Sequence, residues 1–148
     1  SEVDFFSFSL DGPTAAINDP IRGEGSYQAC LEGMAAARAK GFSISLIYTV
    51  SSANIDALPQ MLTLLEKMGV ARFFIQVIGI RGRCAAGERD TGQVTRERWQ
   101  QIVPPLAHKV AQSDIDTVNP KVFLGVSESV ECAGRVGDNY YIIPHGRG

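Results

Sequence analysis

The stretch that decides the fold is SISLIYTVSSANIDALPQMLTLLEKMGVARFFIQVI, residues 43–78. Its hydrophobic pattern predicts a strand, a helix and a second strand, over Ser43–Val50, about 54–68 and Arg72–Ile78. Asn54 or Asp56 can cap the helix at its N-terminus, and Gly69 is placed to end it. Strands joined by a helix pair in parallel through a right-handed crossover, so this unit predicts an α/β protein.

A third strand is predicted ahead of this unit, over Asp4–Leu10, and it shows how the sheet is covered. Its side chains alternate between two faces: Ser7, Ser9 and Asp11 on one, Phe6, Phe8 and Leu10 on the other. Parallel strands that are covered on both faces normally read as unbroken apolar runs. The pattern therefore predicts helices on one face only and a barrel, open or closed, with a polar interior; the alternative is an edge of an ordinary doubly wound sheet.

The segments that join and follow these strands are assigned from turn and cap signals. Residues 11–25 are predicted as a loop, after which Ser26 is the N-cap of a helix that ends at Gly41. Another helix begins at Thr95, and its adjacent prolines at 104 and 105 should kink or split it. Two further strands are predicted, over 121–126 and 140–143.

Composition excludes several classes of protein. The 148 residues suit a single domain, and 45% apolar against 20% charged residues predicts a packed core. A net charge of −2 gives no reason to expect nucleic acid as a partner, and no apolar run is long enough for a membrane span. Cys30, Cys84 and Cys132 are far apart and show no metal-type spacing, which favours a reducing compartment and predicts a cytoplasmic protein.

Ligands of parallel α/β proteins gather at the carboxyl ends of the strands, and the candidate site residues lie there. Hydroxyl and carboxylate groups suit a ribose, and an arginine can hold a carboxylate through two hydrogen bonds. Taken singly, Asp11 and Asn54 are more often turn formers or helix caps. Cys30 is expected in the core, and Cys84 is either a reactive or merely an exposed thiol. Dinucleotide-binding, Walker, zinc-protease and serine-hydrolase motifs are absent from the sequence.

Two segments together resemble the second half of a radical S-adenosylmethionine (SAM) enzyme core: FSFSLDGPTAAINDPIRGEGSYQACLEGMAAARAKG, from residue 6, and SLIYTVSSANIDALPQMLTLLEKMGV, from residue 45. The branch is the one that includes the pyrroloquinoline quinone, haem d1 and peptide-maturation proteins. The resemblance implies that residues 1–128 form three consecutive parallel strands of a partial (β/α)6 TIM-like barrel. It also implies that residues 129–148, with Cys132 and the IIPHG turn, begin a SPASM or twitch segment.

The resemblance also implies a role for each candidate site residue. Ser9 would contact the SAM ribose or carboxylate, Asp11 would organise its loop or reach the ribose, and Arg22 would bind the methionine carboxylate. Thr49 and Asn54 would border the cofactor at the end of the second strand. The residues that would flank the adenine are Gln76, Val77 and Ile78. Cys132 would be a ligand of an auxiliary iron–sulfur cluster in the intact protein.

The sequence departs from this family because it lacks the CxxxCxxC motif that holds the [4Fe–4S] cluster. The expected partner is therefore a missing N-terminal half-barrel that carries the motif. The intact protein would cleave SAM to a 5′-deoxyadenosyl radical and modify a peptide or a cofactor precursor. The 148-residue chain alone is expected to bind no cofactor firmly, to be inactive, and to self-associate as a homo-oligomer through its first strand or open face. The alternative is a non-catalytic α/β nucleotide-binding or interaction module.

Overall fold

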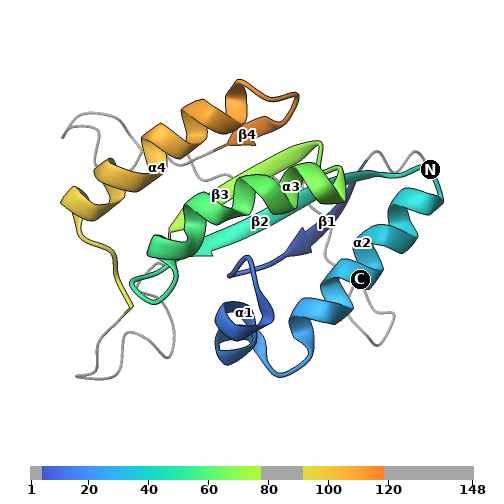
Figure 1. Cartoon of the computed structure of the whole chain (residues 1–148), viewed down its shortest axis with the longest axis horizontal. Helices are drawn as coiled ribbons and strands as arrows, with labels where there is room; N and C mark the ends of the chain where they lie inside the picture. The colour runs from blue at the N-terminus through green and yellow to red at the C-terminus, as the bar shows by residue number, and fades with distance from the viewer. Residues whose placement is uncertain (1–4, 78–91, 119–148) are drawn as a thin grey trace, which may run out of the picture.

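A computed structural model describes residues 5–77 and 92–118, which form a parallel sheet with helices against it (Figure 1). The strands are ordered β1-β2-β3-β4 in the sheet, as β1 (Phe5–Ser9), β2 (Ser43–Val50), β3 (Arg72–Val77) and β4 (Asp116–Val118). The helices are α1 (Ala15–Arg22), α2 (Ser26–Ala39), the 3₁₀ helix η1 (Ile55–Gln60), α3 (Met61–Met68) and α4 (Arg96–Ala111). The α/β class and the parallel strands in sequential order are confirmed.

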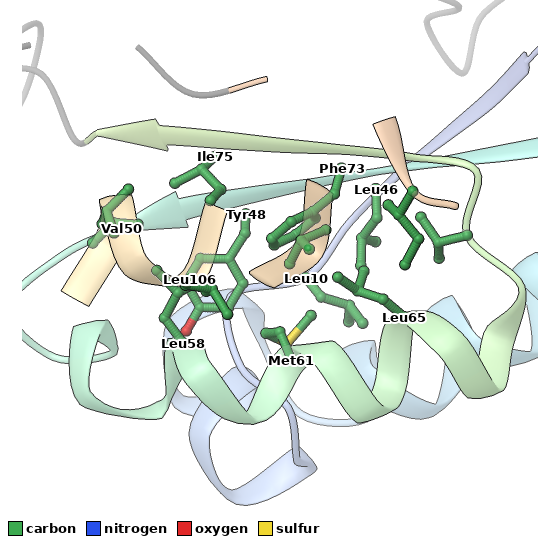
Figure 2. Close-up of a cluster of buried hydrophobic side chains, with 14 of the residues drawn as sticks. Leu10, Leu46, Tyr48, Val50, Leu58, Met61, Leu65, Phe73, Ile75 and Leu106 are labelled. Atoms are coloured by element: carbon green, nitrogen blue, oxygen red, sulfur yellow. The ribbon is translucent and has the colours of Figure 1, made fainter. Parts of the chain in front are cut away.

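The hydrophobic core lies between one face of the sheet and the helices (Figure 2). Leu46, Tyr48 and Phe73 are fully buried on this face. The Tyr48 and Phe73 rings pack edge to face, with their centroids 6.4 Å apart. Side chains of α2, η1, α3 and α4 join the same cluster, among them Met34, Leu58, Leu65 and Val103. Within the described residues, the helices that contribute to this core therefore pack on one face, as the alternation of β1 and β2 predicts.

The opposite face of the sheet is only partly polar. The hydroxyls of Ser7 and Ser45 hydrogen-bond to each other, and the register places Ile47, Phe74 and Val118 in one row across β2, β3 and β4. Near the amino ends of the strands, Arg72 pairs with Asp116 at 2.9 Å and lies 4.6 Å from the centre of the Phe5 ring. This face is called the open face below.

The sequence interpretation was wrong at α1, which occupies a segment assigned to a loop. Pro20 lies inside this helix, and only Asn18 among its eight residues is buried. The single helix expected over 54–68 is also divided into the 3₁₀ helix η1 and the α-helix α3 that follows it. α3 ends at Gly69, which has φ 65°. Neither α1 nor η1 is long enough to show the apolar period on which a helix prediction depends.

One predicted helix boundary and one predicted break also differ from the structure, whereas a second boundary agrees with it. Ser26 is the first residue of α2 rather than its cap, and Gly25 precedes it with φ 79°, a conformation that glycine adopts without strain. Thr95 does cap α4, because its hydroxyl accepts a hydrogen bond from the Arg98 amide at 3.2 Å. Pro104 and Pro105 do not split this helix, which continues from Arg96 to Ala111.

The fourth strand is at Asp116–Val118, whereas the strands predicted over 121–126 and 140–143 and the domain boundary at 128/129 lie outside the described residues. None of the helices in the described ranges is both long and apolar enough to cross a membrane. β1 is at the edge of the sheet, and Phe5 and Phe6 on it are 36% and 40% exposed. Self-association through this edge stays a prediction.

Gly12 is expected to tolerate no side chain, because α1 lies directly against the loop that leaves β1. A β-carbon at this position would lie 2.7 Å from the Asn18 backbone nitrogen and 2.7 Å from Cγ2 of Ile17. Replacing Gly12 with alanine should therefore push α1 outward and lower the free energy of unfolding by about 2 kcal/mol. Urea denaturation measures this effect. Gly41→Ala is unsuitable as a control because Gly41 has φ 84°. Gln100→Ala serves instead, because Gln100 is exposed on α4 and alanine suits a helix. An unfolding midpoint of Gly12→Ala equal to that of the wild type would contradict the prediction.

Candidate functional site

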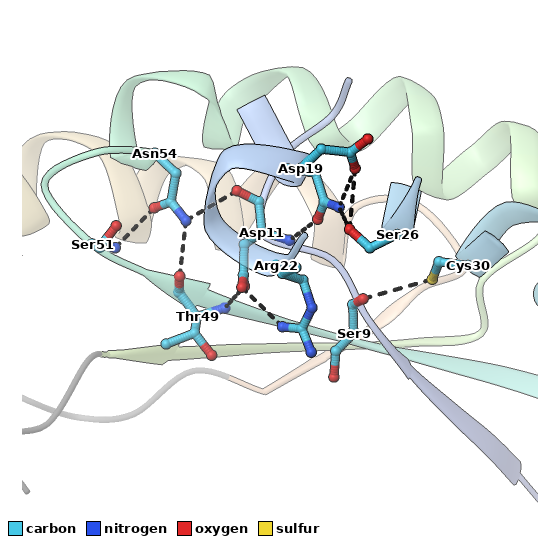
Figure 3. Close-up of polar contacts among 10 residues, drawn as sticks. Ser9, Asp11, Asp19, Arg22, Ser26, Cys30, Thr49, Ser51 and Asn54 are labelled. Carbon is cyan, nitrogen blue, oxygen red and sulfur yellow. Dashed lines mark hydrogen bonds and ion pairs between the residues drawn. The ribbon is translucent and has the colours of Figure 1, made fainter. Parts of the chain in front are cut away.

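Asp11 is the centre of a polar cluster at the carboxyl ends of β1 and β2 (Figure 3). Its side chain is only 7% exposed. Oδ1 accepts a hydrogen bond from the Thr49 amide at 3.1 Å, and Oδ2 pairs with Nη1 of Arg22 at 2.8 Å. Asp11 therefore connects the end of β2 to the end of α1, which explains how residues far apart in the sequence form one site.

Asn54 links the ends of β1 and β2 and has little capacity left for a ligand. Its amide nitrogen donates to the carbonyl oxygens of Asp11 and Thr49 at 3.1 and 2.9 Å, and its Oδ1 accepts from the Ser51 amide at 2.8 Å. The residue is 1% exposed. It precedes η1 at the N-cap position, yet its side chain makes no capping hydrogen bond. The geometry thus gives Asn54 a structural role and contradicts its expected role as a side-chain cap; its place at the border of the cofactor stays a prediction.

Arg22, Ser9 and Thr49 present the polar groups that a ligand can reach. The Arg22 side chain is 37% exposed, and within residues 5–77 and 92–118 its hydrogen-bond partner is Asp11, through Nη1. Ser9 and Thr49 project onto the open face, as the pairing of Ser9 with Ile47 requires. In the same described ranges their hydroxyl groups have no hydrogen-bond partner. These three side chains are called the anion site below, since the remaining guanidinium donors can bind a carboxylate.

Two neighbouring groups are neutral and hold the site in place. The Cys30 thiol is half-buried on α2 and donates to the Ser9 carbonyl at 3.6 Å. Burial raises the pKa of this thiol, and the charge of Arg22 opposes that effect only in part. Burial, and secondly the charge of Asp11, raises the pKa of Tyr48, whose hydroxyl donates to the Asn54 carbonyl at 2.9 Å. Cys30 therefore packs against the core, as expected.

The residues predicted to flank an adenine are only partly described. Gln76 pairs with Thr49 in the sheet register and is exposed on the open face. Val77 points to the other side and packs against the core. Ile78, Cys84 and Cys132 lie outside the described residues, and the roles of all these side chains stay predictions.

A second part of the polar cluster lies around Asn18 and Asp19, which the sequence places among the polar groups at the end of the first strand without an individual role. Asn18 is fully buried and accepts from the Asp11 amide at 2.8 Å, while its amide nitrogen donates to the Ser26 hydroxyl at 2.9 Å. Asp19 accepts from the amides of Gly25 and Tyr27 at 3.0 and 2.9 Å. The available signal was the pair of Asn and Asp side chains ahead of a turn with two glycines, a combination that favours bonds from side chain to backbone.

These residues fit one of the two groups that the family resemblance implies. The exposed guanidinium and the two hydroxyls match the carboxylate and ribose of SAM in donor chemistry. A [4Fe–4S] cluster requires several converging thiolates. Within the described residues no three His, Cys, Asp or Glu side chains come together as a metal site would require, so this part of the chain does not fit the cluster.

Comparisons with known proteins agree with the resemblance. No protein-family model matches the chain. Pre-heme d1 synthase of Dinoroseobacter shibae is 31% identical over 61% of this chain and 22% of its own length. AdoMet-dependent heme synthase of Oleidesulfovibrio alaskensis is 26% identical over 66% of this chain and 25% of its own. The corresponding protein of Nitratidesulfovibrio vulgaris is 30% identical over 57% and 23%.

The chain thus matches about a quarter of the length of these curated relatives. All three are radical SAM enzymes, and two carry AdoMet dependence in their names. The similarity extends over more than half of this chain in each case. The resemblance to radical SAM enzymes is therefore confirmed, and within them the chain is similar to the haem and pre-haem d1 synthases.

Proposed function

We propose that this chain is part of a radical SAM enzyme that modifies a haem precursor, and that its anion site binds the methionine carboxylate of SAM. The observation that carries the proposal is that the Arg22 side chain is paired with Asp11 through one nitrogen, Nη1, and is still 37% exposed. A guanidinium held in this way keeps donors in a fixed direction for a planar carboxylate. The names of the relatives support a tetrapyrrole precursor over a peptide as the substrate.

Each side chain of the anion site has a separate task in this proposal. Arg22 neutralises and orients the carboxylate, and the Ser9 and Thr49 hydroxyls hydrogen-bond the ribose diol or the other carboxylate oxygen. Gln76, exposed beside Thr49 in the register, contacts the adenosyl part. The row of Ile47, Phe74 and Val118 lies next to these groups on the open face, and its apolar side chains keep water away from the bound nucleoside.

SAM, when cleaved reductively, supplies a carbon radical that abstracts hydrogen from a substrate. The residues of this chain contribute binding, orientation and exclusion of water. In this proposal, the ligands of the [4Fe–4S] cluster belong to a CxxxCxxC segment that is absent from these 148 residues. Cys132 is a ligand of an auxiliary cluster. The parallel sheet with helices on one face supports its place in a partial (β/α)6 barrel, whose interior would be the open face.

Replacing Arg22 with glutamine tests the proposal. A charged hydrogen bond contributes about 1.5–3 kcal/mol, so the affinity for SAM should fall by at least about tenfold. The measurement is a titration of the chain with SAM, followed by amide chemical shifts, because this method detects weak binding. Adenosine, which lacks the carboxylate, should bind the wild type and Arg22→Gln equally. Arg98→Gln removes the same charge from an exposed pair with Asp56 and should leave both ligands unaffected.

Two results would overturn the proposal. Equal SAM affinity in the wild type and Arg22→Gln would remove Arg22 from the site. Absence of any shift at Ser9, Arg22 or Thr49 at millimolar SAM would instead favour the alternative, a non-catalytic α/β module.

A further inference from the structure

Arg22 is placed by a helix that has almost no hydrophobic anchorage. α1 has eight residues, among which Asn18 alone is buried, and Ile21 is 44% exposed. Helices of this length are marginal in water without tertiary packing, and Pro20 removes one backbone donor. Polar bonds to the rest of the fold must therefore hold α1 in place.

Asp19 supplies three of these bonds, and it does so one helical turn before Arg22. Its carboxylate accepts from the amides of Gly25 and Tyr27 and from the Ser26 hydroxyl at 3.1 Å, all at the start of α2. This is the end of a helix where backbone N–H groups lack partners and where a negative charge is stabilised. The bond from the Tyr27 amide, with smaller contributions from the other donors, holds the pKa of Asp19 below its usual value, so the carboxylate is charged at neutral pH.

The helix that receives these bonds is itself firmly anchored. Met34 and Ala37 of α2 are buried in the core, and a β-carbon at Gly33 would lie 2.9 Å from the Phe8 ring. Asn18 adds a parallel connection, because it joins the Asp11 amide to the Ser26 hydroxyl. The position of Arg22 is thus determined by α2 through Asp19 and by β1 through Asn18 and Asp11.

We propose that Asp19 is a positioning residue of the anion site: it contacts no ligand, and by fixing α1 to the start of α2 it directs the free donors of Arg22 toward the ligand carboxylate. The SAM part of this inference rests on the proposed function. The ordering of Arg22 does not, because it is a property of the ligand-free chain. Removal of Asp19 should therefore affect Arg22 even in the absence of SAM.

The test compares Asp19→Ala, which removes both acceptor oxygens, with the wild type by two measurements. The first is the ¹H–¹⁵N heteronuclear NOE of the Arg22 Nε–H group without ligand, which should fall toward the value of an exposed arginine. The second is ligand affinity, where SAM should bind about fivefold more weakly while adenosine binding stays unchanged. Asp56→Asn removes a carboxylate from an exposed ion pair and should change neither measurement. Ser26→Ala deletes one bond to Asp19 and also the bond from Asn18, and both of these fix α1 to the start of α2. If Asp19→Ala fails to fold, Ser26→Ala should give a smaller change of the same kind.

A double-mutant cycle separates positioning from a general loss of structure. If Asp19 acts through Arg22, the double variant with Asp19→Ala and Arg22→Gln should bind SAM no more weakly than Arg22→Gln alone. The inference would be overturned if the losses of SAM affinity in the two single variants multiplied in the double variant. It would also be overturned if the Arg22 NOE stayed at the wild-type value. A lower NOE in a chain whose wild type binds no SAM would confirm the positioning of Arg22 and contradict the proposed function.

Discussion

Replacing Asn54 with alanine is expected to lower the free energy of unfolding by about 3 kcal/mol, because three hydrogen bonds from a buried side chain to backbone groups are lost at once. The Asp11 and Thr49 carbonyls lose their donor and the Ser51 amide loses its acceptor. Water cannot readily replace the side chain at a residue that is 1% exposed. The ends of β1 and β2 should separate as a result, and SAM affinity should fall with stability.

Urea denaturation followed by circular dichroism measures the effect on stability. Asn54→Asp is a nearly isosteric comparison that keeps the acceptor for Ser51 but replaces the donor, so it should be destabilised as well. The control is Gln112→Ala, since Gln112 is exposed and, among the described residues, its side-chain amide bonds to the His108 ring at 3.2 Å. A loss below about 1 kcal/mol for Asn54→Ala, in the range of an ordinary single hydrogen bond, would contradict the assigned role.

The second large effect is expected for Asp11→Ala, with a loss of about 2–3 kcal/mol in stability and a loss of SAM binding. The substitution leaves the partly buried Thr49 amide without an acceptor and releases Arg22 from its fixed position. Because Arg22 is partly exposed, water compensates part of the broken ion pair, and the figure is below that of a fully buried pair. Asp11→Asn keeps an acceptor for Thr49, so it should lose less stability but still bind SAM weakly.

The matched control for Asp11 is Asp116→Ala. Asp116 pairs with Arg72 at 2.9 Å, close to the distance in the Asp11–Arg22 pair, but its side chain is 59% exposed. Exposed pairs contribute about 0–1 kcal/mol, so this variant should remain near wild-type stability. If the two variants lost equal stability, burial of Asp11 would not be the source of its effect.

The sequence by itself determined the class of fold and the edge of the sheet where polar groups gather. The alternation in FSFSL and SISLIYTV identified the face that carries the helices, since side chains of a strand point to opposite sides in turn. Thr95 as a cap and Gly69 as a helix end were also predictable, because both depend on local backbone geometry. The position of residues such as Ser9 and Thr49 at strand ends followed from the same local pattern.

Only the tertiary structure decided which of those polar residues are free to bind a ligand. The sequence treated Asn54 and Arg22 alike, as polar residues of loops beside strand ends. The side-chain amide of Asn54 is bonded to the carbonyls of Asp11, just after β1, and of Thr49 in β2, 43 and 5 residues away, whereas Arg22 keeps exposed donors. α1 was missed for the same reason: its stability depends on Asn18 and Asp19 bonding to Asp11 and to the start of α2. Such bonds satisfy groups brought together by folding, and no periodicity along the chain records them.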